Sequence, residues 1–225
     1  MDIVIPLSDT SRWYDVELKY ALRSFEAHMV VDKMFLVGLC PAWLKDVIHI
    51  PYSDIQNLRQ KEKNICGKVL KACNDPRVSD PFIFANDDHF ILNPWKGLYE
   101  HCGPLMTKQK TAYKQTAQNT IDVLGPCNNF DVHCPIIFDK ERFSSAFADM
   151  DFPDFGYCMK TIYCVKNGIE GVETTDVKIE SALNKVQLDE LLIDRDWFSC
   201  GDIAWDGALH KWLNNRFRIK CRWEK

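Results

Sequence analysis

Short apolar runs alternate with segments of helical spacing along the first ninety residues. Residues 2–7 (DIVIPL) form an apolar run bounded by polar residues, which is typical of a buried strand. Asp15 follows at a position that suits a helix N-cap. The apolar residues after it recur at helical intervals: Leu18, Ala21, Leu22, Phe25 and Met29. This strand and amphipathic helix together make half of a βαβ unit.

The same alternation continues to residue 86. Strands are expected over 33–39, 47–51 and 81–86, and a helix over 57–73. These strands are continuous apolar runs rather than strict alternations, which indicates a mostly parallel sheet covered on both faces. The pattern therefore predicts an α/β fold of the Rossmann-like kind, with helices flanking the sheet.

The pattern weakens beyond residue 100. Residues 101–120 are polar and compatible with a helix, and the segment after them holds further candidate elements. These are a strand over 134–139, helices over 143–150 and 177–192, a strand or helix over 159–168, and an amphipathic last strand over 216–225. The chain shows no linker and no internal repeat, so we expect a single domain over residues 1–225.

Composition and charge exclude several classes of protein. The 225 residues carry 28 Lys and Arg against 32 Asp and Glu, a formal net charge of −4. That balance argues against binding nucleic acid or an anionic membrane by overall charge. The start of the chain lacks the pattern of a signal peptide, and no window approaches the roughly 18 apolar residues of a membrane span. We therefore expect a cytoplasmic protein without a transmembrane segment.

The ten cysteines are the one unusual count in the composition. The closest pairs are six or seven residues apart, so the C-x-x-C spacing of a zinc site is missing. We expect reduced thiols that pack as small hydrophobic side chains.

The apolar strand over 81–86 runs into a cluster of polar groups, Asn86, Asp87, Asp88 and His89. Ligands of open parallel sheets bind outside the carboxyl ends of the strands. Hard carboxylate oxygens there suit Mg²⁺ or Mn²⁺, and such a cation suits a diphosphate. The alternative is a helix N-cap or a solvated turn, because Asp and Asn favour both.

Three polar residues of the preceding helix bear on the same edge. Lys63 and Asn64 lie within it, and Lys68 follows one turn later. Either lysine brings positive charge toward an anionic ligand at the acidic turn. The alternative is an ordinary solvated helix face.

The order of these elements resembles the nucleotide-sugar half of GT-A glycosyltransferases. More specifically, four segments are similar to those that mark the Stealth-type sugar transferases and sugar-phosphotransferases: 17–28 (ELKYALRSFEAH), Pro41 to Leu44, 78–90 (VSDPFIFANDDHF) and 131–143 (DVHCPIIFDKERF). Beyond residue 145 the resemblance is carried by short pieces, TTDVKIE and WFSCGD. It implies a nucleoside-diphosphate sugar donor bound by residues 1–90 and an acceptor bound by residues 91–225.

The resemblance also implies roles for single residues of the first half. Asp87 and Asp88 would hold Mn²⁺ or Mg²⁺ on the donor diphosphate, and Asn86 would shape the turn that presents them. The sequence has His89 where a strict DXD motif has an acid. Arg23 would pair with phosphate or brace an acid; the alternative is an ordinary surface arginine.

Other candidates lie in the second half. Asp131 and His133 share one side of an extended segment, where His133 would complete the metal shell and Asp131 would take a proton from the acceptor. Asp176 and Lys178 repeat this spacing, and Lys178 is a candidate donor-binding residue. Asp202 follows a glycine and is either a second candidate base or a turn residue.

These features predict a metal-dependent glycosyltransferase that moves a sugar to an acceptor hydroxyl. Sugar-1-phosphate transfer for a surface polysaccharide needs the same acids and stays open, as does a nucleotide-sugar-binding module without turnover. An unrelated phosphatase or nuclease would need a second carboxylate cluster. The acceptor is a glycan, a lipid-linked sugar or a modified nucleic acid.

Overall fold

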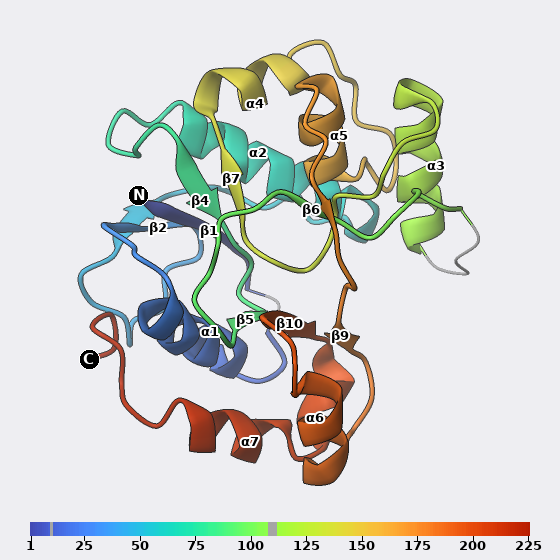
Figure 1. The fold of residues 1–225 in the computed structure, drawn as a ribbon. Coiled ribbons are helices and arrows are strands. Elements are labelled where there is room, and N and C mark those ends of the chain that lie inside the picture. The colour runs from blue at the N-terminus through green and yellow to red at the C-terminus, as the bar shows by residue number, and fades with distance from the viewer. Residues whose placement is uncertain (10, 108–111) are drawn as a thin grey trace.

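The computed structural model describes residues 1–9, 11–107 and 112–225 (Figure 1). Its strands are β1 Ile3–Leu7, β2 Met34–Gly38, β3 Ile48–Ile50, β4 Phe82–Phe84, β5 His89–Ile91, β6 Glu100–His101, β7 Ile136–Phe138, β8 Val172–Glu173, β9 Lys178–Ile179 and β10 Trp197–Cys200. Its helices are α1 Val16–His28, α2 Lys61–Cys73, α3 Ala112–Leu124, α4 Lys140–Phe147, α5 Met159–Lys166, α6 Lys185–Leu192 and α7 Leu209–Arg216, with short 3₁₀ helices η1 Leu58–Gln60 and η2 Asp202–Asp206.

A five-stranded sheet forms the centre of the molecule, in the order β3-β2-β1-β4-β7. The first four strands are mutually parallel, and β7 pairs antiparallel with β4. The connections between the parallel strands include α1 and α2, as βαβ units require. The prediction of a mostly parallel sheet flanked by helices is confirmed.

Both faces of this sheet are covered, which explains the continuous apolar runs. In β1, Ile3 and Ile5 belong to one core cluster, whereas Val4 between them belongs to another. The first cluster is completed by α1, β5, β10 and α7, and the second by α2, α4 and α5. Successive residues of β1 are therefore apolar because each face has its own core.

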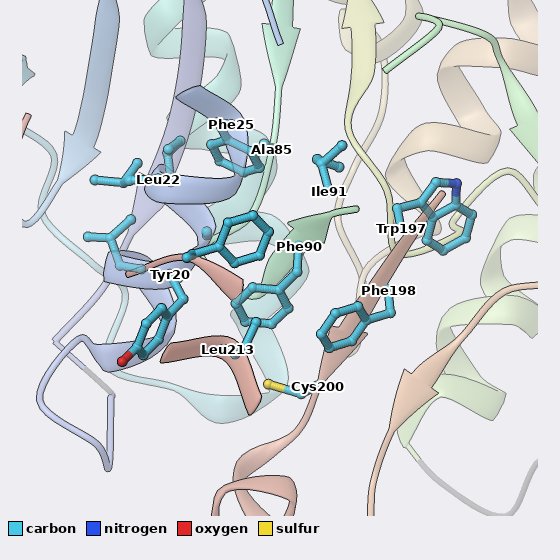
Figure 2. Close-up of a cluster of buried hydrophobic side chains, with 14 of the residues drawn as sticks. Tyr20, Leu22, Phe25, Ala85, Phe90, Ile91, Trp197, Phe198, Cys200 and Leu213 are labelled. Atoms are coloured by element: carbon cyan, nitrogen blue, oxygen red, sulfur yellow. The ribbon is translucent and has the colours of Figure 1, made fainter. Parts of the chain in front are cut away.

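A second sheet, in the order β5-β10-β9, lies beside α1 (Figure 1). Phe90 of β5 stacks on Phe198 of β10 with ring centroids 4.9 Å apart. Figure 2 shows this pair facing Tyr20 and Leu22 of α1, with Leu213 of α7 beside them. Since β5 begins directly after the acidic turn, this packing ties the turn to the second half of the chain.

Several expectations for the second half need adjustment. The ambiguous segment 159–168 is a helix, α5, and the segment 143–150 overlaps α4. The helix expected over 177–192 is shorter, since β9 precedes α6. The helix expected over 101–120 begins at Ala112 in α3, and residues 108–111 of that prediction lie outside the described residues.

The prediction of a last strand over 216–225 is wrong. In the structure α7 ends at Arg216, and the tail makes a single bridge between Glu224 and Leu44. Asp15 occupies the N-cap position of α1, but its side chain does not cap the helix, and its backbone is left-handed with φ 59°.

No helix in residues 1–9, 11–107 and 112–225 is long and apolar enough to cross a membrane. All ten cysteines lie within this described part, and each is a free thiol. Seven of them are buried, as apolar packing requires: Cys66, Cys73, Cys134, Cys158, Cys164, Cys200 and Cys221.

The C-terminal tail accounts for Arg23, which sequence analysis assigned to the donor. Arg23 is only 6% exposed, and its guanidinium donates to both carboxylate oxygens of Glu224 at 2.6 and 2.8 Å. Its remaining nitrogen, Nη1, donates to the Phe217 carbonyl at 2.9 Å. Pairing of Arg23 with a donor phosphate is therefore wrong, because these nitrogens are engaged in the interior. The other role that the resemblance implied, bracing an acid, is the one that the structure shows.

We expect Glu224→Gln to lower the free energy of unfolding by about 3 kcal/mol or more, because it leaves a buried guanidinium without its counter-ion. Urea unfolding followed by circular dichroism measures the loss. The matched control is Asp154→Asn, which breaks the exposed Arg59–Asp154 pair and should cost about 1 kcal/mol or less. Equal losses in the two variants would contradict a structural role for the buried pair.

Candidate functional site

The acidic turn lies at the carboxyl end of β4, as the sequence predicts. The strand ends at Phe84, and the Asp87–Asp88 turn leads directly into β5. The Asn86 backbone N–H donates to Nδ1 of His89 at 3.3 Å, which closes the turn. His89 is fully buried, whereas Asn86, Asp87 and Asp88 are half-buried. The turn thus presents two carboxylates and is held in place by the buried His89 side chain.

Negative charge accumulates around Asp87. Burial raises the pKa of Asp87 to about 7, and the neighbouring carboxylates of Asp88 and Glu17 add to the shift. Glu17 comes from the first turn of α1, is 9% exposed, and has a buried Oε2 without a hydrogen-bond partner among the described residues. Lys61, the first residue of α2, is the nearby cation that opposes the shift. Sequence reasoning missed both Glu17 and Lys61; their places in the first turns of α1 and α2 were the only signal.

These acids fit a cation that is bound together with a diphosphate. In the described ranges, no group of three or more His, Cys, Asp and Glu side chains is arranged to hold a metal ion by itself. Mg²⁺ at nucleotide sites takes one or two carboxylates, keeps several waters and completes its shell with substrate phosphates. Asp87 and Asp88 supply such a pair, and the partnerless oxygen of Glu17 leaves excess negative charge beside them.

The raised pKa of Asp87 predicts a pH dependence of cation binding. Protonated Asp87 is a poor ligand, so affinity should be full above about pH 7 and fall as the pH drops through that value. We expect Mn²⁺ in the presence of a diphosphate diester to bind about tenfold more weakly at pH 6 than at pH 8. Isothermal titration calorimetry measures the affinities. The dependence should disappear in Asp87→Asn; equal affinities for the unsubstituted protein at both pH values would contradict the prediction.

A histidine and an aspartate form a tight pair in the second half of the chain. His133 Nδ1 lies 2.7 Å from Asp176 Oδ2, and the His133 backbone N–H donates to Asp176 Oδ1 at 2.9 Å. Although burial pushes the pKa of Asp176 upward, the hydrogen bonds and charge of His133 hold it below its usual value. An ionised Asp176 accepts a hydrogen bond from the Nδ1 proton, which leaves Nε2 as the acceptor of the ring. Nε2 lies 3.5 Å from Lys178 Nζ.

Strand register places this pair relative to the acidic turn. Ser199 of β10 pairs with His89 on one side and with Lys178 on the other. His89, the residue directly after the turn, and Lys178 are therefore separated by two strand spacings, about 10 Å. The pKa of His89 reflects the same arrangement. Burial lowers it, and the charges of Lys160, His133 and Lys178 lower it further. His89, which follows the acids, and Lys178, whose Nζ lies beside His133, therefore flank Ser199 of β10.

Asp131 does not share a face with His133 as predicted. Its two carboxylate oxygens accept the backbone N–H groups of Lys160 and Thr161, at 3.4 and 3.1 Å, at the start of α5. This is a helix cap, so both oxygens already have donors. The assignment of Asp131 as the base is corrected on this ground. His133 is likewise not grouped with the two acids in a metal-holding set within the described residues.

Two of the three polar residues predicted on α2 form hydrogen bonds with the backbone of neighbouring segments. Lys68 is 1% exposed, and its Nζ binds the Leu7 carbonyl and Ser8 Oγ at the end of β1, and Asp54. Asn64 donates to and accepts from the backbone of Ile55. Lys68 and Asn64 therefore shape the edge of the sheet from within, whereas the Lys63 side chain is exposed.

Asp202 lies at the start of η2 with its side chain exposed. Its carbonyl accepts the Trp13 indole N–H at 3.2 Å, and its carboxylate is 3.9 Å from Arg12. These contacts place η2 beside the loop that follows β1.

In that loop Tyr14 is 93% exposed with a left-handed backbone, φ 54°, a strained conformation for a bulky residue.

Comparison with known proteins identifies the architecture. No family model and no curated protein matches the chain. Among solved structures, the galactosyltransferase LgtC in complex with donor and acceptor sugar analogs is similar, with a TM-score of 0.52 at 15% identity. An active-site mutant of LgtC gives 0.53 at 13% identity, and each comparison covers 99% of this chain and 98% of the other. At these identities the likeness is one of fold, and the chain has the GT-A fold.

Proposed function

We propose that this chain is a metal-dependent glycosyltransferase that uses a nucleoside-diphosphate sugar. The observation that carries the proposal is the acidic turn, Asp87–Asp88, at the carboxyl end of β4, whose next residue, His89, is two strands away from the lysine beside the His133–Asp176 pair. The acidic turn suits a departing diphosphate, and the His133–Asp176 pair suits an attacking hydroxyl. A similar fold in a galactosyltransferase supports the assignment.

On the donor side, residues 1–90 bind the nucleotide sugar. Asp87 and Asp88 hold Mn²⁺ or Mg²⁺, and Asn86 shapes their turn through its contact with His89. The bound cation supplies charge neutralisation for the departing diphosphate. Lys61, an exposed lysine, adds positive charge near Asp87. Without a cation the carboxylates of Asp87, Asp88 and Glu17 repel one another, which favours binding of the cation and the diphosphate together.

On the acceptor side, residues 91–225 bring a hydroxyl to the sugar. His133 Nε2 takes the hydroxyl proton as the oxygen bonds to the anomeric carbon and the bond from that carbon to the diphosphate breaks. Asp176 holds the ring in the required tautomer and stabilises the imidazolium that forms, since its carboxylate already accepts from Nδ1. Lys178 lies beside this pair, with its Nζ 3.5 Å from His133 Nε2.

Turnover of a panel of nucleotide sugars with Mn²⁺, followed by release of nucleotide, tests the proposal. We expect release that stops when EDTA removes the cation. Mass spectrometry of the product separates the two chemistries, because transfer of a sugar adds no phosphorus and transfer of sugar-1-phosphate does. Binding of a nucleotide sugar without any release would instead support a binding module, and absence of any metal-dependent binding would overturn the proposal.

A further inference from the structure

An open groove begins at the histidine pair and runs along α6. It lies between the segment 178–183 and the helix, with a volume of about 510 Å³, a size typical of small-molecule sites. Lys178 lines the groove, and its Nζ lies 3.5 Å from His133 Nε2. The groove is therefore continuous with the side of the site where an acceptor hydroxyl must arrive.

The lining of the groove matches a hydroxyl-rich ligand. Glu180 and Glu190 offer carboxylate acceptors, and Ser181 offers a hydroxyl. Gln187 also lines the groove, and its Oε1 accepts from the Asn184 backbone N–H, which fixes the side chain and leaves its amide nitrogen as a donor. Neighbouring hydroxyls of a sugar need such donors and acceptors side by side.

Apolar side chains and the local charge narrow the choice of ligand further. Leu183 and Leu191 line the groove and can pack against the C–H face of a sugar ring. Two glutamates against one lysine give the lining a slight excess of negative charge, which disfavours nucleic acid and phosphorylated ligands. The lining thus favours an uncharged carbohydrate.

We propose that this groove, defined by residues 178–191, is the acceptor subsite and that the acceptor is a neutral glycan. The inference rests on the proposed transferase function and specifies its acceptor. The terminal sugar of the glycan reaches His133 past Lys178, and the rest of the chain lies along α6. Of the acceptors left open by the sequence, this excludes a modified nucleic acid.

The test uses the full chain and identified probes. A glycan array of neutral oligosaccharides, with lactose, maltotriose and chitobiose among them, selects the tightest-binding sugar, which is then titrated into ¹⁵N-labelled protein. We expect shifts of backbone amides in residues 178–191. Ser181→Trp fills the groove and should weaken this sugar at least about tenfold. The adjacent exposed residue gives the matched control: Ala182 does not line the groove, and Ala182→Trp should bind within about twofold of the unsubstituted protein.

The inference is overturned if no neutral glycan binds, if the shifts lie outside 178–191, or if both tryptophan variants bind alike. A separate titration with UDP and Mn²⁺ reports on the donor side. Shifts around Asp87 and Asp88 without any glycan response would leave the transferase proposal standing and remove only the acceptor groove. Glycan shifts in the groove without a nucleotide response would remove the transferase proposal instead.

Discussion

Asp88→Asn is expected to lower the rate of sugar transfer by about 10³-fold or more. The substitution removes one charge from the carboxylate pair proposed to hold the cation, so the negative charge developing on the departing diphosphate would lose its stabilisation. Steady-state release of nucleotide from the preferred donor, with saturating Mn²⁺, measures the loss. The amide has nearly the same shape as the carboxylate, so the turn and its contact to His89 should remain.

The control for this variant is Asp149→Asn, an exposed aspartate after α4. It removes the same charge from the chain and should leave transfer within about twofold of the unsubstituted rate. Calorimetry adds a second readout, because Asp88→Asn should also weaken Mn²⁺ binding in the presence of nucleotide. Turnover of Asp88→Asn at the unsubstituted rate with any accepted donor would remove the acidic turn from the site.

His133→Ala is expected to lower kcat by about 10²- to 10⁴-fold with little change in KM for the donor, because proton removal from the acceptor is lost while the donor side is intact. Asp176→Asn should have a smaller effect in the same direction, since an amide no longer fixes the ring tautomer. His133 is partly exposed, with a side-chain exposure of 30%, so added imidazole should restore part of the activity of His133→Ala.

Two variants make the test of this pair discriminating. His210→Ala removes an exposed imidazole on α7 and should leave kcat within about twofold, with no response to imidazole. Asp131→Asn should cost about 1 kcal/mol of stability through the weakened cap of α5. Full activity of His133→Ala, combined with a large loss of kcat in stable Asp131→Asn, would return the role of base to Asp131.

Local pattern was sufficient for the elements that build the donor half. The apolar run over 2–7 contains β1, the helical spacing after Asp15 gives α1, and the run over 81–86 contains β4. Strands that are buried on both faces are apolar at consecutive positions, which is why the sequence could predict them. The structure confirms these elements. The position of Asp87 and Asp88 at the carboxyl edge follows from the same run, because in a parallel sheet the end of a strand is also the edge where ligands bind.

The partners of the charged side chains were beyond the reach of local pattern. Arg23 and Glu224 are 201 positions apart, and His133 and Asp176 are 43 apart. The i, i+2 spacing of Asp131 and His133 assumed an extended segment, whereas that segment is irregular and Asp131 turns to the start of α5. A carboxylate can cap a helix, pair with a cation or bind a ligand, and which of these it does depends on the donors that the fold brings to it.

By itself, the sequence determined the α/β architecture of this protein and the place of its acidic turn, because hydrophobic periodicity records which side chains are buried. The tertiary structure alone decided that Arg23 supports the C-terminal tail, that the charges of Glu17 and Lys61 act on Asp87, and that His133 pairs with Asp176. Those contacts join residues from separate elements. Their geometry is set by sheet register and helix packing, and neither can be predicted from the spacing of neighbouring residues.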